Sequence, residues 1–493
     1  MTQDLARILG RIGRPRIAVV GDAILDEYVW GEVERISPEG PIPVLRVARR
    51  ELRAGGAGSV AANLGRLGAD VAFFGVRGAD PAGEKLVGLL GSDGVDAGGA
   101  VVEGGRPTTA KTRFIGYVQH ANRAQQQMLR VDDEVSRSIE AKTLEALVSR
   151  FESAGRERRF DAVLVSDYMK GLVSTELLRL LRGAARDAPF LIDPALAGDY
   201  EAYRGAFLIC PNRYEASRAT GTDCSDLDGC REAARKLASD LDVQAAAVTM
   251  DRDGIYLHER SGQSRHFPTR ARVVADVTGA GDMVLSVLGL LVAAGADLAQ
   301  AVELANIAAG IEVRKVGVTP VSREEILQEL RYRNHPGVSK IKKLDELRPL
   351  LASDRAKGKQ IVFTNGCFDL LHPGHHHLLH GAAAEGDVLV VAVNSDASIR
   401  RIKGPGRPVI PEEERLLQLA ALEVVDYVVA FEDDTPIPLL EALRPGVLVK
   451  GEEYRDGIVV GREIVEGYGG RIAFVSQMPG FSTTSILAKR AGS

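Results

Sequence analysis

The chain has few cysteines: only Cys210, Cys224, Cys230 and Cys367 occur among its 493 residues. Neither their number nor their spacing suits a disulfide framework or a paired Cys-x-x-Cys metal site, so both classes are excluded. The chain also has no excess of positive charge, because 62 Lys and Arg residues are balanced by 67 Asp and Glu residues. This balance excludes non-specific binding to nucleic acid or anionic membranes, so that anionic ligands must be held by local sites.

A long hydrophobic run is missing as well. The longest apolar stretch, around Val284 to Ala294, is interrupted by glycine and is too short to span a bilayer. The first residues, MTQDLARILGRIGRPR, contain no apolar core of a signal peptide. We therefore expect a soluble, cytoplasmic protein with no membrane partner and no nucleic-acid partner.

The sequence is instead rich in glycine, with 53 residues, and in short apolar runs that alternate with helix-length amphipathic segments. This alternation predicts doubly wound α/β architecture, in which ligands bind beyond the carboxyl ends of the strands. The expected parts are a large doubly wound domain at 1–325, a linker with a connecting helix at 326–355, and a smaller Rossmann-like domain at 356–493. The proline-containing stretch 30–47 predicts a small β flap made of short pieces, either a lid or a dimerisation surface.

The segment 276–282, Asp-Val-Thr-Gly-Ala-Gly-Asp, precedes an apolar stretch of helix length. Its small residues are expected where a helix begins, and the unpaired N–H groups at such a position attract phosphate. Gly279, Ala280 and Gly281 are therefore the expected anion hole. Asp282 follows directly and is our candidate for the general base that accepts the proton of an attacking hydroxyl group. Taken alone, the loop also allows a plain turn with an N-cap aspartate.

Other polar residues in this part of the chain follow strand-like runs or glycine pairs. Asn212 and Glu215 are candidates for orienting Mg²⁺, directly or through water, although their spacing is also typical of a helix cap. A second group is expected near the substrate because its members stand at strand ends or beside close-approach glycines: Asp22, Asp26, Gly55, Gly56, Asn63 and Asp193.

Together these residues resemble the ribokinase/PfkB family of sugar kinases, and the resemblance covers about residues 1–320. In that family the last aspartate of the 276–282 signature is the base, which here is Asp282. The small residues before it form the anion hole, and an Asn-x-x-Glu pair such as Asn212 and Glu215 serves Mg²⁺.

Within that family, the segments 34–47, 166–171 and 191–206 look like the branch that phosphorylates heptose 7-phosphate. This closer resemblance adds Lys170 to the expected substrate contacts and supports the inclusion of Asp193. Two residues depart from the branch, because Ala195 replaces a usual lysine and Met283 replaces a usual hydroxyl residue. These departures concern a phosphate contact and leave the expected chemistry unchanged.

Five of the nine histidines lie between His372 and His380, directly after a strand-like run. His372 and His375 can project toward one point from the first turn of a helix and stabilise charge on nucleotide phosphates. A sugar phosphate is already anionic near neutral pH, so its attack on an α-phosphorus requires no general base. A zinc site lacks further ligands at suitable spacing, and a surface cluster without function is the other alternative. His376 and His377 are expected to be structural.

This arrangement resembles the cytidylyltransferase-like nucleotidyltransferases over about residues 358–490. In that family the two histidines bind the triphosphate, and they are the expected catalytic residues here. The resemblance implies further nucleotide contacts before the histidines and in the later phosphate-binding segments: Thr364, Asn365, Lys403, Lys450, Ser482 and Thr483. In the first domain, the resemblance to the sugar kinases makes Asn212 an expected nucleotide contact as well. Phe481 departs from the small or basic residue expected before Ser482.

The two halves together resemble a bifunctional family that fuses a heptose-7-phosphate kinase to a heptose-1-phosphate adenylyltransferase. The resemblance implies phosphorylation of D-glycero-D-manno-heptose 7-phosphate at C1 and, after a separate phosphatase, transfer of AMP from ATP to heptose 1-phosphate for lipopolysaccharide precursor synthesis. ATP is then the substrate at both sites, Mg²⁺ is the cofactor, and a homodimer through the kinase domain is expected. A CTP-dependent enzyme making a CDP-activated envelope precursor, or a domain reduced to nucleotide sensing, is not excluded by the motifs.

Overall fold

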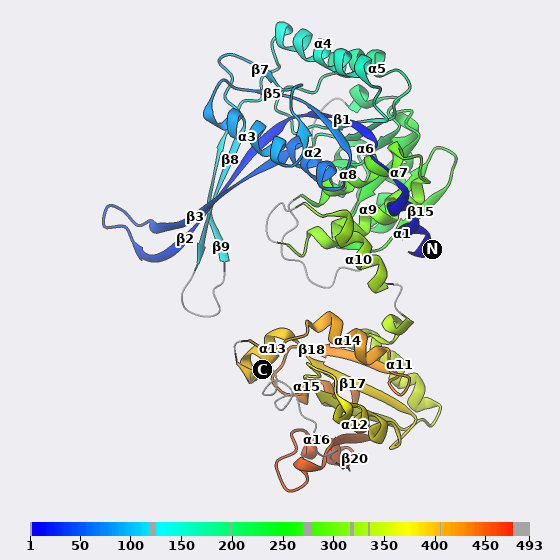
Figure 1. Ribbon diagram of the computed structural model, residues 1–493. Coiled ribbons are helices and arrows are strands. Elements are labelled where there is room, and N and C mark those ends of the chain that lie inside the picture. The colour runs from blue at the N-terminus through cyan, green and yellow to red at the C-terminus, as the bar shows by residue number, and fades with distance from the viewer. Residues whose placement is uncertain are drawn as a thin grey trace. The chain divides into compact units, whose positions relative to one another are not determined.

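The computed structural model describes residues 2–117, 125–196, 200–269, 279–315, 320–333, 336–404 and 406–476. The chain divides into two compact units, Met1–Leu330 and Arg331–Ser493, and each is built from helices and mostly parallel strands (Figure 1). The predicted α/β class is therefore confirmed for both halves. Among the described helices, none combines the length and the apolar character needed to cross a membrane.

The first unit contains a nine-stranded sheet that is parallel except at one edge. Its strands in chain order are β1 (Arg16–Gly21), β4 (Asp70–Phe74), β6 (Val95–Asp96), β10 (Ala162–Ser166), β11 (Phe190–Asp193), β12 (Leu208–Ile209), β13 (Ala245–Thr249), β14 (Ile255–Glu259) and β15 (Ser264–Phe267). They lie in the order β15-β14-β13-β12-β11-β10-β1-β4-β6, and β14 pairs in an antiparallel manner with both β13 and β15. Along β1, Ile17 and Val19 enter one hydrophobic core while Ala18 and Val20 enter the other, so both faces of the sheet are buried.

Helices cover both faces of this sheet, as the doubly wound prediction requires. The helices are α1 (Thr2–Arg11), α2 (Ala57–Arg66), α3 (Pro81–Ser92), α4 (Ala141–Glu157), α5 (Thr175–Ala185), α6 (Arg213–Thr220), α7 (Leu227–Asp240), α8 (Ala280–Ala293), α9 (Leu298–Glu312) and α10 (Arg323–Arg333), with 3-10 turns η1 (Tyr200–Tyr203) and η2 (Asp251–Asp253). Apolar residues of α1, α2, α8 and α9 fill one core, and those of α4, α5 and α7 fill the other. Helix α8 is buried along most of its length, which explains why its sequence is almost continuously apolar.

A second sheet forms the flap. It contains β2 (Ala23–Ile36), β3 (Pro43–Gly56), β8 (Ala110–Tyr117) and β9 (Gln125–Asp133) in the order β3-β2-β8-β9. Figure 1 shows its strands extending away from the larger sheet. The strands β2 and β3 have 14 residues each, so the flap is much larger than the short pieces predicted for 30–47. Two short strands, β5 (Val76–Arg77) and β7 (Val101–Val102), form a separate parallel pair.

The second unit is a parallel sheet of five described strands covered by helices. The strands are β16 (Ile361–Gly366), β17 (Val388–Asn394), β18 (Tyr427–Phe431), β19 (Val447–Gly451) and β20 (Arg471–Val475). Their order is β18-β17-β16-β19-β20, so the chain adds β17 and β18 on one side of β16 and then β19 and β20 on the other side. Such a reversal opens a crevice at the carboxyl ends of the central strands, where ligands bind in sheets of this kind.

The helices of the second unit follow its strands. They are α11 (Leu344–Ala356), α12 (Pro373–Ala383), α13 (Asp396–Lys403), α14 (Glu412–Ala420), α15 (Ile437–Leu443) and α16 (Arg462–Gly467), with 3-10 turns η3 (Pro336–Lys340) and η4 (Glu452–Tyr454). The stretch predicted to link the halves, 326–355, includes most of α11, whose Leu347 and Leu351 are buried in the second unit's core. These buried leucines show that the connecting helix packs as part of that unit.

Candidate active sites

The first unit has a cavity of about 570 Å³ at the carboxyl ends of its central strands. Four carboxyl groups line it together with polar residues from neighbouring loops. The lining includes Asp167, Tyr168, Lys170, Asp193, Asn212, Glu215, Thr249, Gly279, Gly281 and Asp282. The structure thus brings together residues that the sequence analysis selected from four separate segments.

Asp282 lies in the first turn of α8 and is almost fully buried. Its carboxylate Oδ1 accepts a hydrogen bond of 3.0 Å from the hydroxyl group of Tyr168, on the loop after β10. Burial raises the pKa of Asp282 to about 7, although the hydrogen bond from Tyr168 acts in the opposite direction. A carboxylate with a pKa near neutrality is suited to accept a proton from a sugar hydroxyl.

The predicted anion-hole residues form the start of the same helix. Gly279 is the N-cap and has φ of 94°, a left-handed conformation that favours glycine. The N–H groups of the first turn have no partner within the helix and are available to an anion. A Cβ atom placed on Gly281 would meet no atom within 4 Å, so the space beside it is open. The first three residues of the signature, 276–278, lie outside the described residues.

The predicted magnesium residues Asn212 and Glu215 also line the cavity, at the start of α6. They form a capping box, in which Asn212 Oδ1 accepts from the Glu215 N–H at 2.9 Å and Glu215 Oε2 accepts from the Asn212 N–H at 2.8 Å. The spacing of Asn212 and Glu215 therefore does form a helix cap. The cap uses Glu215 Oε2 and leaves the other carboxylate oxygen of Glu215 outside it. For Glu215, the helix cap and a cation contact are compatible because each uses a different carboxylate oxygen.

The carboxyl groups of the cavity repel one another. Burial and the charges of Glu215 and Asp282 raise the pKa of Asp193 well above its usual range. A divalent cation with its nucleotide phosphates would relieve this repulsion, so the residues present fit Mg²⁺. In the described part of the chain, no three His, Cys, Asp or Glu side chains lie close enough to hold a metal ion by themselves. Such a cation would therefore depend on phosphate and water ligands in addition to Glu215 or Asn212.

Several predicted sugar contacts lie behind the cavity wall. Asp22 is buried, and its Oδ2 accepts from the backbone N–H groups of Tyr168 at 3.1 Å and Lys170 at 3.0 Å. Asp22 therefore holds the loop that carries Tyr168. Asn63 on α2 is fully buried and is not among the lining residues.

The glycine pair adjoins β2 of the flap. Asp26 is buried and forms an ion pair with Arg113. A Cβ atom at Gly55 would lie 2.1 Å from Asp26 Oδ2, and one at Gly56 would lie 2.4 Å from the carbonyl oxygen of Asp22. Both glycines are required because the backbone approaches these acidic residues closely.

Asp167 and Tyr168 also line this cavity, although neither was predicted from the sequence as a site residue. Both follow β10, so the strand-end signal was present, but only Lys170 was selected from that segment. The hydroxyl group of Tyr203 donates to Asp167 Oδ2 at 2.8 Å. Because these two residues are 36 positions apart, no local pattern in the sequence marks this contact. Both departures from the kinase branch lie at buried positions: Met283 is fully buried in the core, and Ala195 is only 4% exposed.

The second unit has its own cavity of about 560 Å³, at the reversal between β16 and β19. Its wall contains both predicted histidines and the predicted residues of β16, α13 and β19. The lining includes Thr364, Asn365, Cys367, Asp369, His372, His375, Lys403, Arg407 and Lys450. Ser482 and Thr483, also predicted to bind nucleotide, and Phe481 lie outside the described residues.

His372 and His375 lie face to face at the start of α12. Their ring centroids are 3.8 Å apart with an interplanar angle of 19°. Burial lowers the pKa of His375 to about 4, and burial also lowers the pKa of His372. Both shifts favour the neutral ring, which can donate an N–H group to an anion. His377, by contrast, contacts the Ser476 hydroxyl at 3.1 Å and does not line the cavity.

Lys450 at the end of β19 is a half-buried cation of this cavity. Its Nζ donates to Asn365 Oδ1 at 2.6 Å, and burial lowers its pKa to about 8. A desolvated ammonium group held by a neutral amide is suited to bind phosphate. Thr364 donates its hydroxyl to the carbonyl oxygen of Val449 at 3.1 Å, which joins β16 to β19 beside Lys450.

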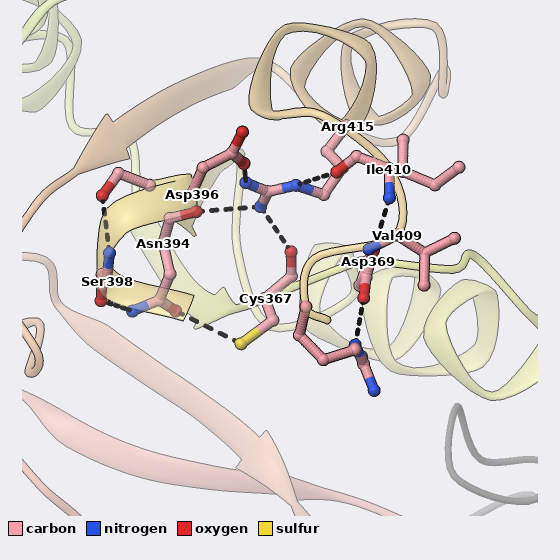
Figure 2. Close-up of polar contacts among 10 residues, drawn as sticks. Cys367, Asp369, Asn394, Asp396, Ser398, Val409, Ile410 and Arg415 are labelled. Atoms are coloured by element: carbon pink, nitrogen blue, oxygen red, sulfur yellow. Dashed lines mark hydrogen bonds and ion pairs between the residues drawn. The ribbon is translucent and has the colours of Figure 1, made fainter. Parts of the chain in front are cut away.

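A buried polar network supports one wall of this cavity (Figure 2). Arg415 is fully buried and donates to the carbonyl oxygens of Cys367 at 2.7 Å and Asn394 at 2.9 Å, and to Asp396 Oδ1 at 2.7 Å. Asp369 accepts from the N–H groups at 409 and 410 at 2.7 and 2.8 Å, and pairs with Arg407. The network fastens the loop before α14 to the loop that precedes the histidines.

Comparison with known proteins divides the chain at the same place. Residues 14–325 match the pfkB family of carbohydrate kinases, and residues 363–487 match the cytidylyltransferase-like family. The chain is 44% identical to the Bifunctional protein HldE of Geobacter sulfurreducens, over 99% of this chain and 98% of that protein. It is 46% identical to the Bifunctional protein HldE of Geobacter metallireducens, over 96% of this chain and 94% of that protein.

Solved structures support the fold of the first unit. The chain is similar to a structure of Arabidopsis thaliana ribokinase complexed with ribose and ATP, with 20% identity, a TM-score of 0.50, and coverage of 65% of this chain and 99% of that one. It is also similar to phosphofructokinase-2 of Escherichia coli in complex with potassium, with 18% identity, a TM-score of 0.52 and the same coverage. At these identities the likeness concerns the fold alone.

Proposed function

The chain belongs to the bifunctional HldE family and is a transferase with a carbohydrate kinase unit and a nucleotidyltransferase unit; from this premise we propose which reactions its two cavities perform. The first unit transfers the γ-phosphoryl group of ATP to C1 of D-glycero-D-manno-heptose 7-phosphate. A separate phosphatase removes the 7-phosphate. The second unit then transfers AMP from ATP to heptose 1-phosphate, giving ADP-heptose and pyrophosphate for lipopolysaccharide core precursors.

In the kinase reaction, the C1 hydroxyl oxygen attacks the γ-phosphorus and ADP leaves, while the carboxylate of Asp282 accepts the hydroxyl proton. The hydrogen bond from Tyr168 orients this carboxylate and keeps part of it ionised near neutral pH. The N–H groups of Gly279, Ala280 and Gly281 stabilise the charge of the transferring group. Mg²⁺, when bound with ATP, neutralises phosphate charge, and Glu215 and Asn212 are the residues that would hold it.

In the nucleotidyl transfer, a phosphate oxygen of the sugar phosphate attacks the α-phosphorus of ATP and pyrophosphate leaves. His372 and His375 donate hydrogen bonds to the phosphates, and Lys450 and Lys403 supply positive charge. Asn365 holds the ammonium group of Lys450 in the cavity. No side chain has to remove a proton, because the attacking phosphate is already an anion.

One observation supports this assignment best: each unit has its own cavity with its own set of groups. The first cavity contains a candidate base and an anion hole, and the second contains a histidine pair and a lysine. The test compares two variants in two assays. Asp282→Asn should abolish sugar-dependent ADP formation and leave pyrophosphate release from ATP and heptose 1-phosphate intact, while His375→Ala should do the reverse. Full kinase turnover in Asp282→Asn would exclude Asp282 as the base.

The same pyrophosphate assay, run with ATP, CTP, GTP and UTP, tests the choice of nucleotide. We expect turnover with ATP, and exclusive use of CTP would replace ADP-heptose by a CDP-activated product. We place both reactions in the cytoplasm, which agrees with the four free cysteines.

The flap is the proposed surface of a homodimer. Exposed apolar residues are concentrated on its strands and on the turn between β2 and β3: Ile36, Ile42, Val47, Leu129 and Val131. Exposed apolar patches of this kind mark interaction surfaces in soluble proteins. Light scattering of the protein should give twice the mass of 52.8 kDa, and Leu129→Glu should shift it toward the monomer.

A further inference from the structure

The loop after β10 contains a backbone conformation that its sequence disfavours. Met169 has φ of 57°, in the left-handed region, although a long side chain rarely adopts this conformation. Its side chain is 43% exposed, so packing of the side chain does not impose the conformation. Met169 directly follows Tyr168, whose hydroxyl group contacts Asp282. The strained residue therefore lies in the turn that presents Tyr168 to the candidate base, and residues held in this way concentrate at functional sites.

The N–H groups of this turn are bound by two carboxylates. Asp22 Oδ2 accepts from the N–H groups of Tyr168 at 3.1 Å and Lys170 at 3.0 Å. Asp167 Oδ1 accepts from the N–H of Met169, which lies between them, at 2.9 Å. Successive N–H groups around a left-handed residue form a concavity that favours an anion. Asp167 belongs to the loop itself, whereas Asp22 supplies its carboxylate from a segment 146 residues away from Tyr168.

The large sheet places Asp22 beside this turn. Strands β1 and β10 pair in parallel up to Gly21 and Ser166, so the residues that follow the two strands emerge side by side. The N–H of Asp22 also donates to the carbonyl oxygen of Ser166 at 3.3 Å, and Asp22 is buried. Burial raises the pKa of Asp22 to about 6, so its carboxylate is mostly ionised at pH 7. Hydrogen bonds from backbone N–H groups to an ionised carboxylate are stronger than those to a neutral acceptor.

We propose that Asp22 is a positioning residue of the kinase, whose carboxylate holds the left-handed turn at Met169 and thereby keeps the Tyr168 hydroxyl on Asp282. The inference rests on the proposed kinase function, in which Asp282 is the base. It gives Asp22 a role other than the sugar contact expected from the sequence, and Asp22 is not among the residues that line the cavity. Without this acceptor, Met169 is free to relax to a negative φ, which redirects the Tyr168 side chain.

The test combines substitutions of Asp22 and Tyr168 in the full chain and measures kcat/KM for heptose 7-phosphate and KM for ATP at pH 7. Asp22→Ala should lower kcat/KM about as much as Tyr168→Phe does, by about 5- to 50-fold, with KM for ATP unchanged. In the Tyr168→Phe background, Asp22→Ala should cost less than about 2-fold more, because the hydrogen bond through which it acts is already absent. Asp22→Asn keeps an acceptor oxygen for both N–H groups and should retain most of the activity.

Asp80→Ala is the matched control. Asp80 is another aspartate of the first unit that accepts from two backbone N–H groups, those of Gly83 at 2.8 Å and Thr108 at 2.7 Å, and neither group belongs to the turn. Any loss of kcat/KM that this variant causes should be equal in the wild-type and Tyr168→Phe backgrounds.

Substitutions of Met169 test the turn from the loop side and serve if Asp22→Ala does not fold. Met169→Val should lower kcat/KM more than Met169→Gly, because a β-branched residue disfavours the left-handed conformation and glycine accepts it. An equal effect of the two substitutions would contradict the role of the turn.

Hydrogen exchange of the segment 167–172 reports on the turn in the absence of substrate. Exchange should be faster in Asp22→Ala than in Asp22→Asn. If wild type does not turn over heptose 7-phosphate while exchange behaves in this way, the kinase assignment falls and the hold of Asp22 on the turn stands. If wild type is active, but Asp22→Ala leaves kcat/KM unchanged or costs equally in both backgrounds, the kinase assignment stands and Asp22 is not a positioning residue.

Discussion

Replacing Tyr168 by phenylalanine tests how the first cavity sets the protonation of its base. The substitution removes the 3.0 Å hydrogen bond to Asp282 and leaves the ring in place. Hydrogen bonds to charged groups contribute about 1.5 to 3 kcal/mol, and one pKa unit corresponds to about 1.36 kcal/mol. The pKa of Asp282, about 7 in the intact protein, should therefore rise by about one to two units.

The direction of the effect follows from the role of the base. Asp282 is active when it is ionised, so kinase kcat/KM falls as the pH decreases through its pKa. Because this pKa is higher in the variant, the fall should begin at a higher pH than in wild type. At pH 7 the expected loss is about 5- to 50-fold, and it should largely disappear at pH 9. The assay is kcat/KM for heptose 7-phosphate between pH 5.5 and 9.5.

Tyr256→Phe is the matched control for this experiment. Tyr256 is also a buried tyrosine of the first unit, but it lies on β14 and does not line the cavity. Both variants share the titration of the substrate phosphate, so only a difference between them reports on Asp282. If the acid limb of Tyr168→Phe coincides with that of wild type, the hydrogen bond from Tyr168 does not set the pKa of Asp282.

Three further predictions concern the second cavity and the metal. Arg415→Met leaves several buried carbonyl groups and Asp396 without their donor. The free energy of unfolding of the second unit, measured by urea denaturation, should therefore fall by about 3 to 5 kcal/mol, while kinase turnover persists. Adenylyl-transfer kcat/KM for ATP should fall above about pH 8, where Lys450 loses its proton, and Lys450→Arg should remove this fall; a pH profile checks both. Glu215→Gln, which keeps an oxygen for the helix cap, should raise the Mg²⁺ concentration for half-maximal kinase activity by about 10-fold without changing that of adenylyl transfer.

Much of the fold was predictable because local patterns determine it. Alternating apolar strands and amphipathic helices predicted two α/β units, and small residues before an apolar stretch predicted the helix start at Gly279. The histidine pair was recognisable because His372 and His375 occupy one turn after a strand. These signals need only residues that are close in sequence.

The missed features depend on contacts between distant segments. Tyr168 and Asp282 are 114 residues apart, and nothing local marks the tyrosine as the partner of the base. Arg415 follows three glutamates and has the pattern of an exposed helix, yet it is fully buried because four acceptors surround its guanidinium group. The neutrality of the histidine pair likewise follows from burial, which the sequence does not reveal.

The extent of the flap was underestimated for a different reason. Residues 23–56 form one long hairpin, but several residues on β3 are exposed and charged, such as Arg46, Arg49 and Arg50. Without a buried face, the alternation that identifies a strand is weak. The prolines at 38, 41 and 43 then suggested short pieces where the structure has a single turn between long strands.

The most direct test of the two-site account is mass-spectrometric analysis of the products made by the full chain from heptose 7-phosphate and ATP, with and without a phosphatase that removes the 7-phosphate. Without the phosphatase, we expect heptose 1,7-bisphosphate and ADP. With the phosphatase, we expect ADP-heptose and pyrophosphate as well. Unchanged heptose 7-phosphate, or a bisphosphate that yields no nucleotide sugar after the phosphatase has acted, would contradict it.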